Sequence, residues 1–390
     1  MKKVSIAIIL TLMMTSVAFA QYEPKGKISK AESALNSGDL DEAKAEVDLA
    51  FEVNNKGKVK DDSKSWYVRG DVYKAIFLDD STEFQNLSDN ALDIATESYR
   101  KAMEMEKETS PFYQFSMTAL NQLYGVVMNE GAAFYNEGKY AEAFDKFKLG
   151  LEVFPDDTTA YLYAGTSAQQ AEMYEESLKM YEGLIETGNA DADVYKAVIY
   201  LYKTQFENID KVVEYCNKGV EKFPEDEAFV QEKITTLIVA ERADEAEKEL
   251  KAAIENDPDN AVLYYQLGYL YDDQQEEVEK AFEAYKNAID VDPDYFEANF
   301  NAGVIYYNKA ADILKELNNM SIKEYNKNET AYMERAKVEF EKALPYLEKA
   351  YELQPDDIQI METLEGLYIR LKMNEKAEEL DKKIKEIRGE

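Results

Sequence analysis

The chain has 390 residues and carries 79 acidic against 45 basic side chains, for a formal net charge of −34 and a pI near 4.4. A surface this acidic repels phosphate backbones, so we expect no nucleic-acid partner. Hydrophobic residues make up 45% of the chain, with 29 Tyr and 17 Phe, which excludes a disordered acidic tail. The sequence contains no histidine, so the commonest general base and the commonest zinc ligand are both missing.

The first twenty residues are organised like a bacterial secretory signal peptide. Lys2 and Lys3 precede an apolar run, Val4 to Met14, and Ala18-Phe19-Ala20 supplies the small-x-small cleavage pattern. The stretch 4–20 is shorter than the roughly 20 residues that a membrane-spanning helix needs, which disfavours a retained anchor. We therefore expect cleavage after residue 20 and no membrane insertion afterwards. The mature protein is then exported, to the periplasm or to the cell surface and beyond.

Residues 21–110 are predicted to form N-terminal helix pairs with an irregular insertion. Small and apolar residues recur at helical spacing in segments 38–50, 66–73 and 95–102. The segment 38–50 reads as a second helix preceded by a short one, and the other two segments pair with each other. The polar stretch 79–90 lies between them and exceeds the repeat length. Such an insertion is expected to form a loop or to lengthen a helix.

Residues 111–307 are predicted to form a central repeat array. Pro224, Pro258 and Pro293 are 34 and 35 residues apart, and a period of about 34 residues indicates a helical solenoid. The segment 111–123 is apolar with helical spacing. It either adds a helix or lengthens the next one.

The unit that ends at Pro293 shows the pattern within one period. Leu267, Gly268 and Tyr271 lie on one stripe of a first helix, together with Tyr264. A second helix follows, and Ala281, Tyr285 and Ala288 lie on its packed stripe. Proline then ends the second helix, because it cannot continue a helix.

Residues 308–342 interrupt the period and are predicted to be an inserted helical hairpin, joined near residues 318–328. Pro345 falls inside the following helical pattern, so a kink or a helix start is expected there. Residues 343–390 are predicted to form a C-terminal helix pair that ends in a charged capping helix. Cys216, the only cysteine, lies at a packed-face position and is predicted to be a buried core residue.

This pattern resembles the tetratricopeptide repeat (TPR) along nearly the whole mature length. The resemblance implies an all-α, right-handed superhelical solenoid of about eight to nine stacked antiparallel helix pairs. It also implies that the first helices line a concave surface, where extended or helical peptides bind. The family's lysine/asparagine clamp for chaperone carboxylates has no counterpart here, because the predicted groove positions offer only isolated lysines.

The candidate ligand-binding residues are those opposite each packing stripe of the first helices. Tyrosine offers a large contact area with a polar tip, and Asn, Gln and Thr can bond a peptide backbone. The set consists of Met128, Tyr135, Asn136, Leu162, Thr166, Gln169, Lys196, Tyr200, Lys203, Gln231, Thr235, Tyr265, Tyr269, Phe300, Tyr307 and Asn308. These side chains could instead be tolerated at a wet face or pack against the next unit.

The sequence predicts no catalysis, no cofactor and no metal site. Repeats and insertions account for almost every mature residue, so no room remains for a catalytic domain. Carboxylate pairs such as Asp156-Asp157 and Asp272-Asp273 are interpreted as solvated turn or capping residues. No stretch has the spacing of a calcium-binding loop.

The sequence therefore favours a non-catalytic scaffold or adaptor that binds a peptide or protein segment in its groove. Cell-envelope assembly or maintenance is the expected setting, from the family resemblance and the leader. The alternative is a structural or self-associating surface module, which uses its acidic exterior and the protruding hairpin while the groove stays unused. The sequence identifies neither the partner nor the oligomeric state.

Overall fold

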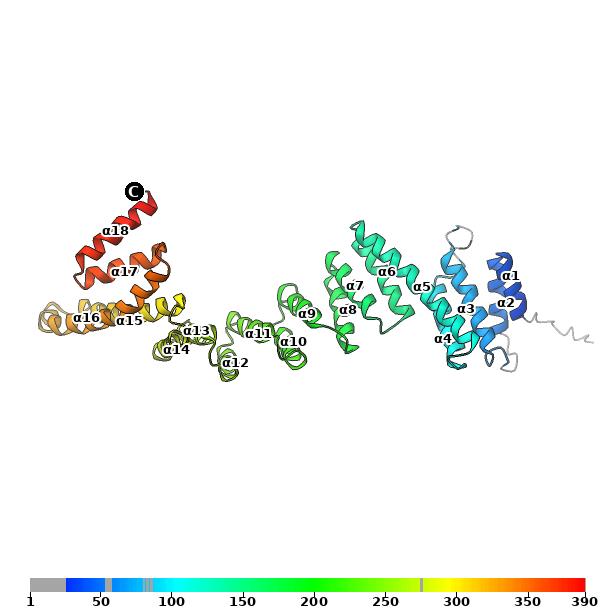
Figure 1. Cartoon of the computed structure of the whole chain (residues 1–390), viewed down its shortest axis with the longest axis horizontal. Helices are drawn as coiled ribbons and strands as arrows, with labels where there is room; N and C mark the ends of the chain where they lie inside the picture. Colours follow the sequence, from blue (N-terminus) through cyan, green and yellow to red (C-terminus); the bar gives the residue numbers. More distant parts are fainter. Residues whose placement is uncertain are drawn as a thin grey trace, which may run out of the picture. The chain divides into compact units, whose positions relative to one another are not determined.

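A computed structural model describes residues 26–52, 58–79, 81, 84, 87–273 and 276–389. Every regular element among these residues is an α-helix (Figure 1). The helices fall into two compact units, which divide after Ala190, within the predicted central array. The predicted leader, residues 1–20, lies outside the described residues.

Unit 1 contains four successive helix pairs. They are α1 (Ile28–Ser37), α2 (Leu40–Glu52), α3 (Ser63–Leu78), α4 (Ala91–Glu104), α5 (Pro111–Asn136), α6 (Tyr140–Val153), α7 (Thr158–Gln170) and α8 (Tyr174–Glu186).

Unit 2 contains five pairs, and in both units each helix packs against its neighbours in the chain. They are α9 (Ala192–Thr204), α10 (Ile209–Lys222), α11 (Ala228–Val239), α12 (Ala243–Asn256), α13 (Ala261–Asp273), α14 (Val278–Val291), α15 (Phe296–Asn318), α16 (Ile322–Leu353), α17 (Ile358–Arg370) and α18 (Asn374–Arg388). The predicted all-α solenoid of stacked antiparallel helix pairs is confirmed, with nine pairs among the described residues.

The turn inside most pairs contains one residue in the left-handed conformation. These residues are Gly38, Gly138, Glu172, Glu207, Glu241, Glu276 and Lys372. From Gly138 to Glu276 they recur every 34 or 35 residues, so the backbone geometry follows the period of the prolines. The conformation costs a non-glycine residue about 1–2 kcal/mol. The turn offsets part of this cost, because the next N–H bonds a carbonyl five residues back, as Met173 does to Ala168 at 2.8 Å.

A glycine of the first helix gives the second helix room for a large side chain. At Gly70, Gly165 and Gly268 an added Cβ would lie 2.6 or 2.7 Å from the ring of Tyr99, Tyr181 or Tyr285, respectively. Contacts this short do not occur between real atoms, so the ring can cross the first helix only where no Cβ is present. Tyr99 and Tyr285 are fully buried as a result.

Two insertions lengthen helices rather than form separate elements. The segment 111–123 is the first half of α5, a single helix of 26 residues. Ser110 begins this helix by accepting a hydrogen bond from the N–H of Tyr113.

In unit 2, α15 and α16 form the inserted hairpin, but its turn is shorter than predicted. The expected junction at residues 318–328 is wrong, because α16 already begins at Ile322. Ser321 and Glu324 form a capping box there, which satisfies the first N–H groups of the helix. Of the two alternatives expected at Pro345, a kink or a helix start, the helix start is wrong, because Pro345 lies inside α16.

The predicted core role of Cys216 is confirmed. Its side chain on α10 is fully buried and forms no disulfide. Burial raises the pKa of the thiol to about 12, so the group stays protonated and unreactive at neutral pH.

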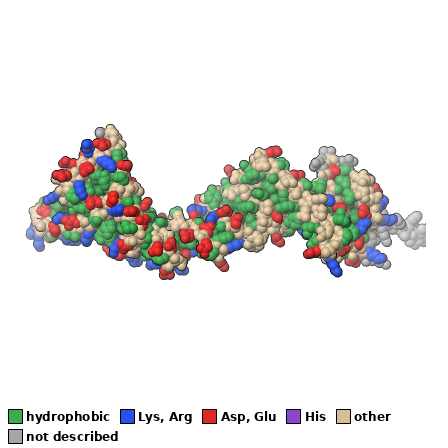
Figure 2. Space-filling model, in the orientation of Figure 1, with side chains coloured by type: hydrophobic (Ala, Val, Ile, Leu, Met, Phe, Trp, Pro, Cys, Tyr) green, Lys and Arg blue, Asp and Glu red, His purple; other side chains and the backbone are tan. Residues whose placement is uncertain are grey.

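The surface carries both signs of charge. Figure 2 shows acidic and basic side chains interspersed over α15 to α18. No helix in the described ranges is long and apolar enough to cross a membrane.

One carboxylate in unit 1 lies in an unfavourable place. Arg100 of α4 donates hydrogen bonds to the carbonyl oxygens of Glu152 and Val153 of α6. Burial, followed by the nearby carboxylate of Asp93, raises the pKa of Glu152 to about 7, against an opposing effect of Lys148. Because the folded-state pKa lies above the unfolded value of about 4.3, the protonated form favours folding. Stability is therefore lost as the pH rises from about 4.5 to 7.

We predict that Glu152→Gln removes this pH dependence from unit 1. The free energy of unfolding of the variant should match that of the wild type near pH 4.5. Near pH 8 it should be higher by about 1 kcal/mol, after allowance for solvent screening. Urea unfolding at the two pH values, followed by circular dichroism, measures the difference. Asp145→Asn, at an exposed site of the same helix, is the control and should change neither value. An unchanged pH profile in Glu152→Gln would contradict the assignment.

A second prediction uses two glycines of unit 1 that differ in their surroundings. Gly70→Ala should lower the free energy of unfolding by about 1–3 kcal/mol, because the new methyl group meets the Tyr99 ring. Gly125→Ala should raise it by about 0.5–1 kcal/mol, because nothing lies within 4 Å and alanine favours the helix. Urea titration of both variants gives the two values, and effects of the same sign would contradict this account.

Candidate functional site

In unit 2, the first helices of three successive pairs, α9, α11 and α13, border two neighbouring pockets. The pocket between α9 and α11 has a volume of about 230 Å³. It is lined by Lys196, Ile199, Tyr200, Lys203, Ala228, Phe229 and Glu232. The pocket between α11 and α13 has a volume of about 250 Å³ and is lined by Thr235, Ile238, Val239, Tyr265, Gln266 and Tyr269. We call the surface that holds both pockets the unit 2 groove.

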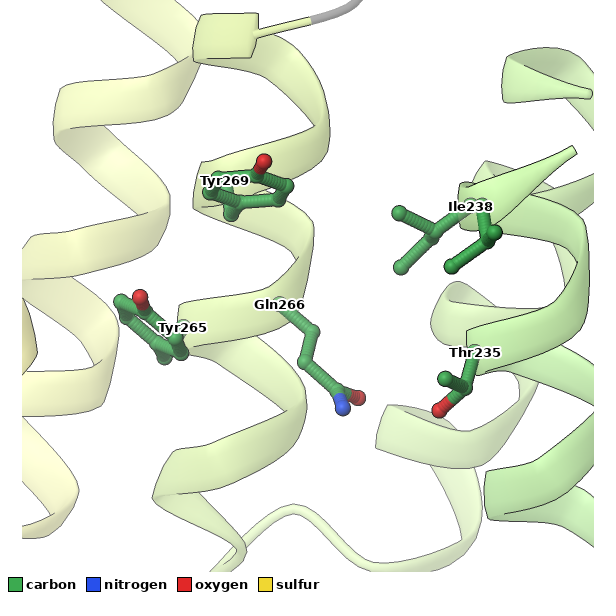
Figure 3. Close-up of a pocket in the computed structure, with 6 residues that line it drawn as sticks. Thr235, Ile238, Tyr265, Gln266 and Tyr269 are labelled. Atoms are coloured by element: carbon green, nitrogen blue, oxygen red, sulfur yellow. The ribbon is translucent and has the colours of Figure 1, made fainter. Parts of the chain in front are cut away.

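Figure 3 shows how the second pocket is built. Thr235 and Ile238 extend from α11, and the amide of Gln266 on α13 points toward them. Tyr265 and Tyr269 lie one turn apart on α13. Most of the lining is apolar, and the polar groups are hydroxyls and an amide.

The charges of the first pocket are already paired. Lys196 forms an ion pair with Asp226 at 2.7 Å, and Lys203 forms one with Glu232 at 2.6 Å. The hydrogen bond between these two side chains lowers the pKa of Asp226 and raises the pKa of Lys196. These lysines are therefore neutralised locally and do not form an anion-binding set.

The two predicted groove tyrosines of α13 differ in their contacts. The ring of Tyr265 packs 5.8 Å from that of Tyr285 and 5.4 Å from that of Tyr295. Tyr269 is 40% exposed. The negative charge of Asp273 is the main cause that raises the pKa of Tyr269. Tyr265 thus combines a structural role with a place in the pocket lining, whereas Tyr269 lies mainly at the surface.

The structure brings together the predicted residues Lys196, Tyr200, Lys203, Thr235, Tyr265 and Tyr269 in the lining of the unit 2 groove. Gln231 is half-buried beside them and donates a hydrogen bond to Thr235.

The predicted residues on α15 lie outside both pockets. Phe300 stacks on Phe296, and Tyr307 packs edge-on against Phe340 of α16. Asn308 is exposed.

The predicted residues of unit 1 form a separate group. Thr166 and Gln169 lie beside the hydroxyl of Tyr181, which donates a hydrogen bond to Gln169 at 3.1 Å. Tyr135 packs against Tyr140 and Met128 is half-buried, while Leu162 and Asn136 are exposed.

Several lining residues were missed by the sequence argument. The missed positions on the unit 2 groove are Ile199, Ala228, Phe229, Glu232, Ile238, Val239 and Gln266. The signal was present, since Ile238 and Val239 lie three and four residues after Thr235 and so share its face. Phe229 is harder to assign from the sequence, because its buried ring also packs over Gly219 of α10.

No group of three or more Cys, Asp or Glu side chains within the described ranges is placed to hold a metal ion.

Comparison with known families identifies the repeat. A family model described as "Tetratricopeptide repeat" matches residues 249–283, and one described as "TPR repeat" matches residues 273–309. The chain carries tetratricopeptide repeats. The matched residues include all of α13, which borders the second pocket of the unit 2 groove. A comparison with curated protein sequences gives no match.

Several solved structures of TPR proteins are similar to parts of the chain. YrrB, described as a TPR protein with an unusual peptide-binding site, is 25% identical over 52% of this chain and 97% of its own, with a TM-score of 0.33. A TPR protein from Bacteroides fragilis is 21% identical over 63% and 98%, with a TM-score of 0.34. The C-terminal part of a TPR protein from Cytophaga hutchinsonii is 14% identical over 66% and 94%, with a TM-score of 0.45.

The contacts of Tyr265 and Tyr269 predict that truncation of the two side chains has effects of different size. Tyr265→Ala should lower the free energy of unfolding by about 2–4 kcal/mol, because it removes the ring from the Tyr285 and Tyr295 contacts. Tyr269→Ala should cost less than about 1 kcal/mol, since Tyr269 is 40% exposed and has no such ring contacts among those described. Thermal and urea unfolding measure both. Equal losses would show that Tyr269 belongs to the core and not to the groove surface.

Proposed function

We propose that the unit 2 groove holds a segment of another protein. The tetratricopeptide repeats make the chain a protein–protein interaction scaffold. The observation that carries the finer proposal is the pair of adjacent, mostly apolar pockets along α9, α11 and α13. Peptide binding fits them better than a small molecule does, because each is smaller than the roughly 300–1,000 Å³ of a typical small-molecule site.

Exposed apolar side chains along the same surface support this proposal. Tyr200 is 51% exposed, Val239 is 77% exposed and Tyr269 is 40% exposed. Large apolar side chains that gather at one exposed surface usually mark a binding region. A bound segment would cover them and remove this apolar area from water.

We also propose an exported, envelope-associated scaffold. The support is the leader-like sequence of residues 1–20, with its basic start, apolar run and Ala-Phe-Ala site. Both matching family models describe repeats and neither describes an enzyme, which favours a non-catalytic role.

The hairpin formed by α15 and α16 supports a second candidate function, self-association. Ile322 at its turn is 83% exposed, and Met333 and Val338 on α16 are 51% and 41% exposed. These side chains are spread along one long helix and line neither of the two groove pockets, so the unit 2 groove is the better candidate.

Site-specific photo-crosslinking distinguishes the two candidates. A photo-reactive residue in place of Tyr200 or Tyr269 should capture a different protein from the native envelope fraction, and one in place of Met333 should not. Mass spectrometry of the crosslinked species identifies what is captured. The groove proposal fails if only the Met333 position crosslinks, and capture of a second copy there would favour self-association.

A further inference from the structure

The hydroxyl of Tyr285 is left without a partner near Tyr265 and Tyr269, which line the unit 2 groove. In the α3–α4 pair, Tyr99 crosses Gly70 and donates a hydrogen bond to Asp71 at 2.6 Å. In the α7–α8 pair, Tyr181 crosses Gly165 and donates one to Gln169 at 3.1 Å. Tyr285 crosses Gly268 in the same way and its side chain is 0% exposed.

No hydrogen-bond partner for the Tyr285 hydroxyl exists among the residues that the structure describes. Asn301 of α15 faces this hydroxyl and that of Tyr265, but its contact with Tyr285 falls short of hydrogen-bond geometry. Asp272 and Tyr269 of α13 also lie close enough to act on Tyr285. A buried hydroxyl without a partner is costly, and such a group is expected to have a role.

A second polar atom at the same surface is also unsatisfied. The amide oxygen of Gln266, which lines the pocket between α11 and α13, is buried and accepts no hydrogen bond from any described residue. This oxygen can only accept, so it calls for an N–H or O–H group from outside the chain.

Two carboxylates, Asp272 and Asp273, lie at the end of α13, and Asp272 is close enough to act on Tyr285. No lysine or arginine in the described part of the chain forms an ion pair with Asp272 or Asp273. Burial, followed by repulsion from Asp273, raises the pKa of Asp272, as expected for a carboxylate without a cation. Glu297 of α15 adds a third negative charge near Tyr265. In the pocket between α9 and α11, by contrast, both lysines form ion pairs with carboxylates.

The chemistry of these groups selects one kind of ligand. The Asp272 and Asp273 carboxylates and the Gln266 amide oxygen are acceptors, and a phenol hydroxyl can accept as well as donate. Lysine and arginine side chains carry only donors, and both carry the opposite charge. Tyr269 offers an exposed ring against which such a cation can pack.

We propose that the α13 part of the unit 2 groove recognises a lysine or arginine side chain of the bound protein segment. The cation lies at Asp272 and Asp273 beside the hydroxyl of Tyr285 and packs on the ring of Tyr269. The amide oxygen of Gln266 accepts an N–H from the backbone of the same segment. This inference rests on the proposed function, because it specifies what the groove selects.

Selection from a random dodecapeptide phage library on the immobilised full chain tests the inference. At about 0.15 M salt, where long-range attraction is screened, the wild type should enrich peptides with Lys or Arg beside an apolar residue. Asp272→Asn plus Asp273→Asn should lose this enrichment. The matched control is Glu255→Gln plus Asp290→Asn, which removes the same charge from exposed sites on α12 and α14 and should keep it.

A selected peptide then measures the effect in solution by fluorescence anisotropy. Replacing its cation by Gln should weaken binding about tenfold, as for other hydrogen bonds to charged groups. Tyr285→Phe keeps the ring and should weaken the cationic peptide several-fold while leaving the urea midpoint unchanged or higher. A lower midpoint with unchanged binding would show that the hydroxyl has a structural role only, and would overturn its part in recognition.

The outcomes separate this inference from the proposed function. Enrichment of peptides without a cation, or the same loss of enrichment in both double variants, overturns the inference and leaves groove binding intact. Selection of no peptide at all by the wild type overturns both.

Discussion

The contact between a first-helix glycine and a second-helix aromatic ring is the constraint on which the repeat packing depends. At Gly70, Gly165 and Gly268 the ring occupies the space that a Cβ would fill. The two helices of a pair can therefore approach closely, and the ring is removed from water. The same arrangement places the hydroxyl of the second-helix tyrosine beside polar side chains of the first helix. Core packing and groove chemistry thus depend on the same residues.

This arrangement explains why the hydrogen bonding of the tyrosine hydroxyl differs between pairs. The residue that follows the glycine, or the one four positions after it, decides whether the hydroxyl has a partner inside the chain. Asp71 and Gln169 supply that partner in unit 1. In the α13–α14 pair the corresponding positions hold Tyr269 and Asp272, and the hydroxyl of Tyr285 stays without one. The packing of tyrosine on glycine is therefore the same in these three pairs, while the polar side chains near the hydroxyl differ.

The strong negative charge of the chain has no single structural use. Many carboxylates pair with lysines on the surface, and such exposed pairs contribute little to stability. Others cap helices, as Asp157 and Asp357 do through the N–H groups of Ala160 and Ile360. Asp272 and Asp273 do neither among the described residues. The same dipeptide type can thus be a cap at one turn and part of a recognition surface at another.

The sequence by itself determined the helix pairs, their period and the packed positions. Leu267, Gly268, Ala281 and Tyr285 could be assigned because helical spacing and residue size are local properties. It also indicated one groove face, and Lys196, Tyr200, Thr235 and Tyr269 do line pockets there.

Only the tertiary structure decided which groove residues are free and which are used in packing. Tyr265 and Tyr269 are alike in sequence, but the rings of Tyr285 on α14 and of Tyr295, just before α15, pack against Tyr265. The unpartnered hydroxyl of Tyr285 was likewise beyond the sequence, whereas the helix start at Ile322 was not, because Ser321 and Glu324 form a local capping box. The state of the Tyr285 hydroxyl depends on which atoms of distant residues come within hydrogen-bonding distance, and a periodic pattern carries no information about that.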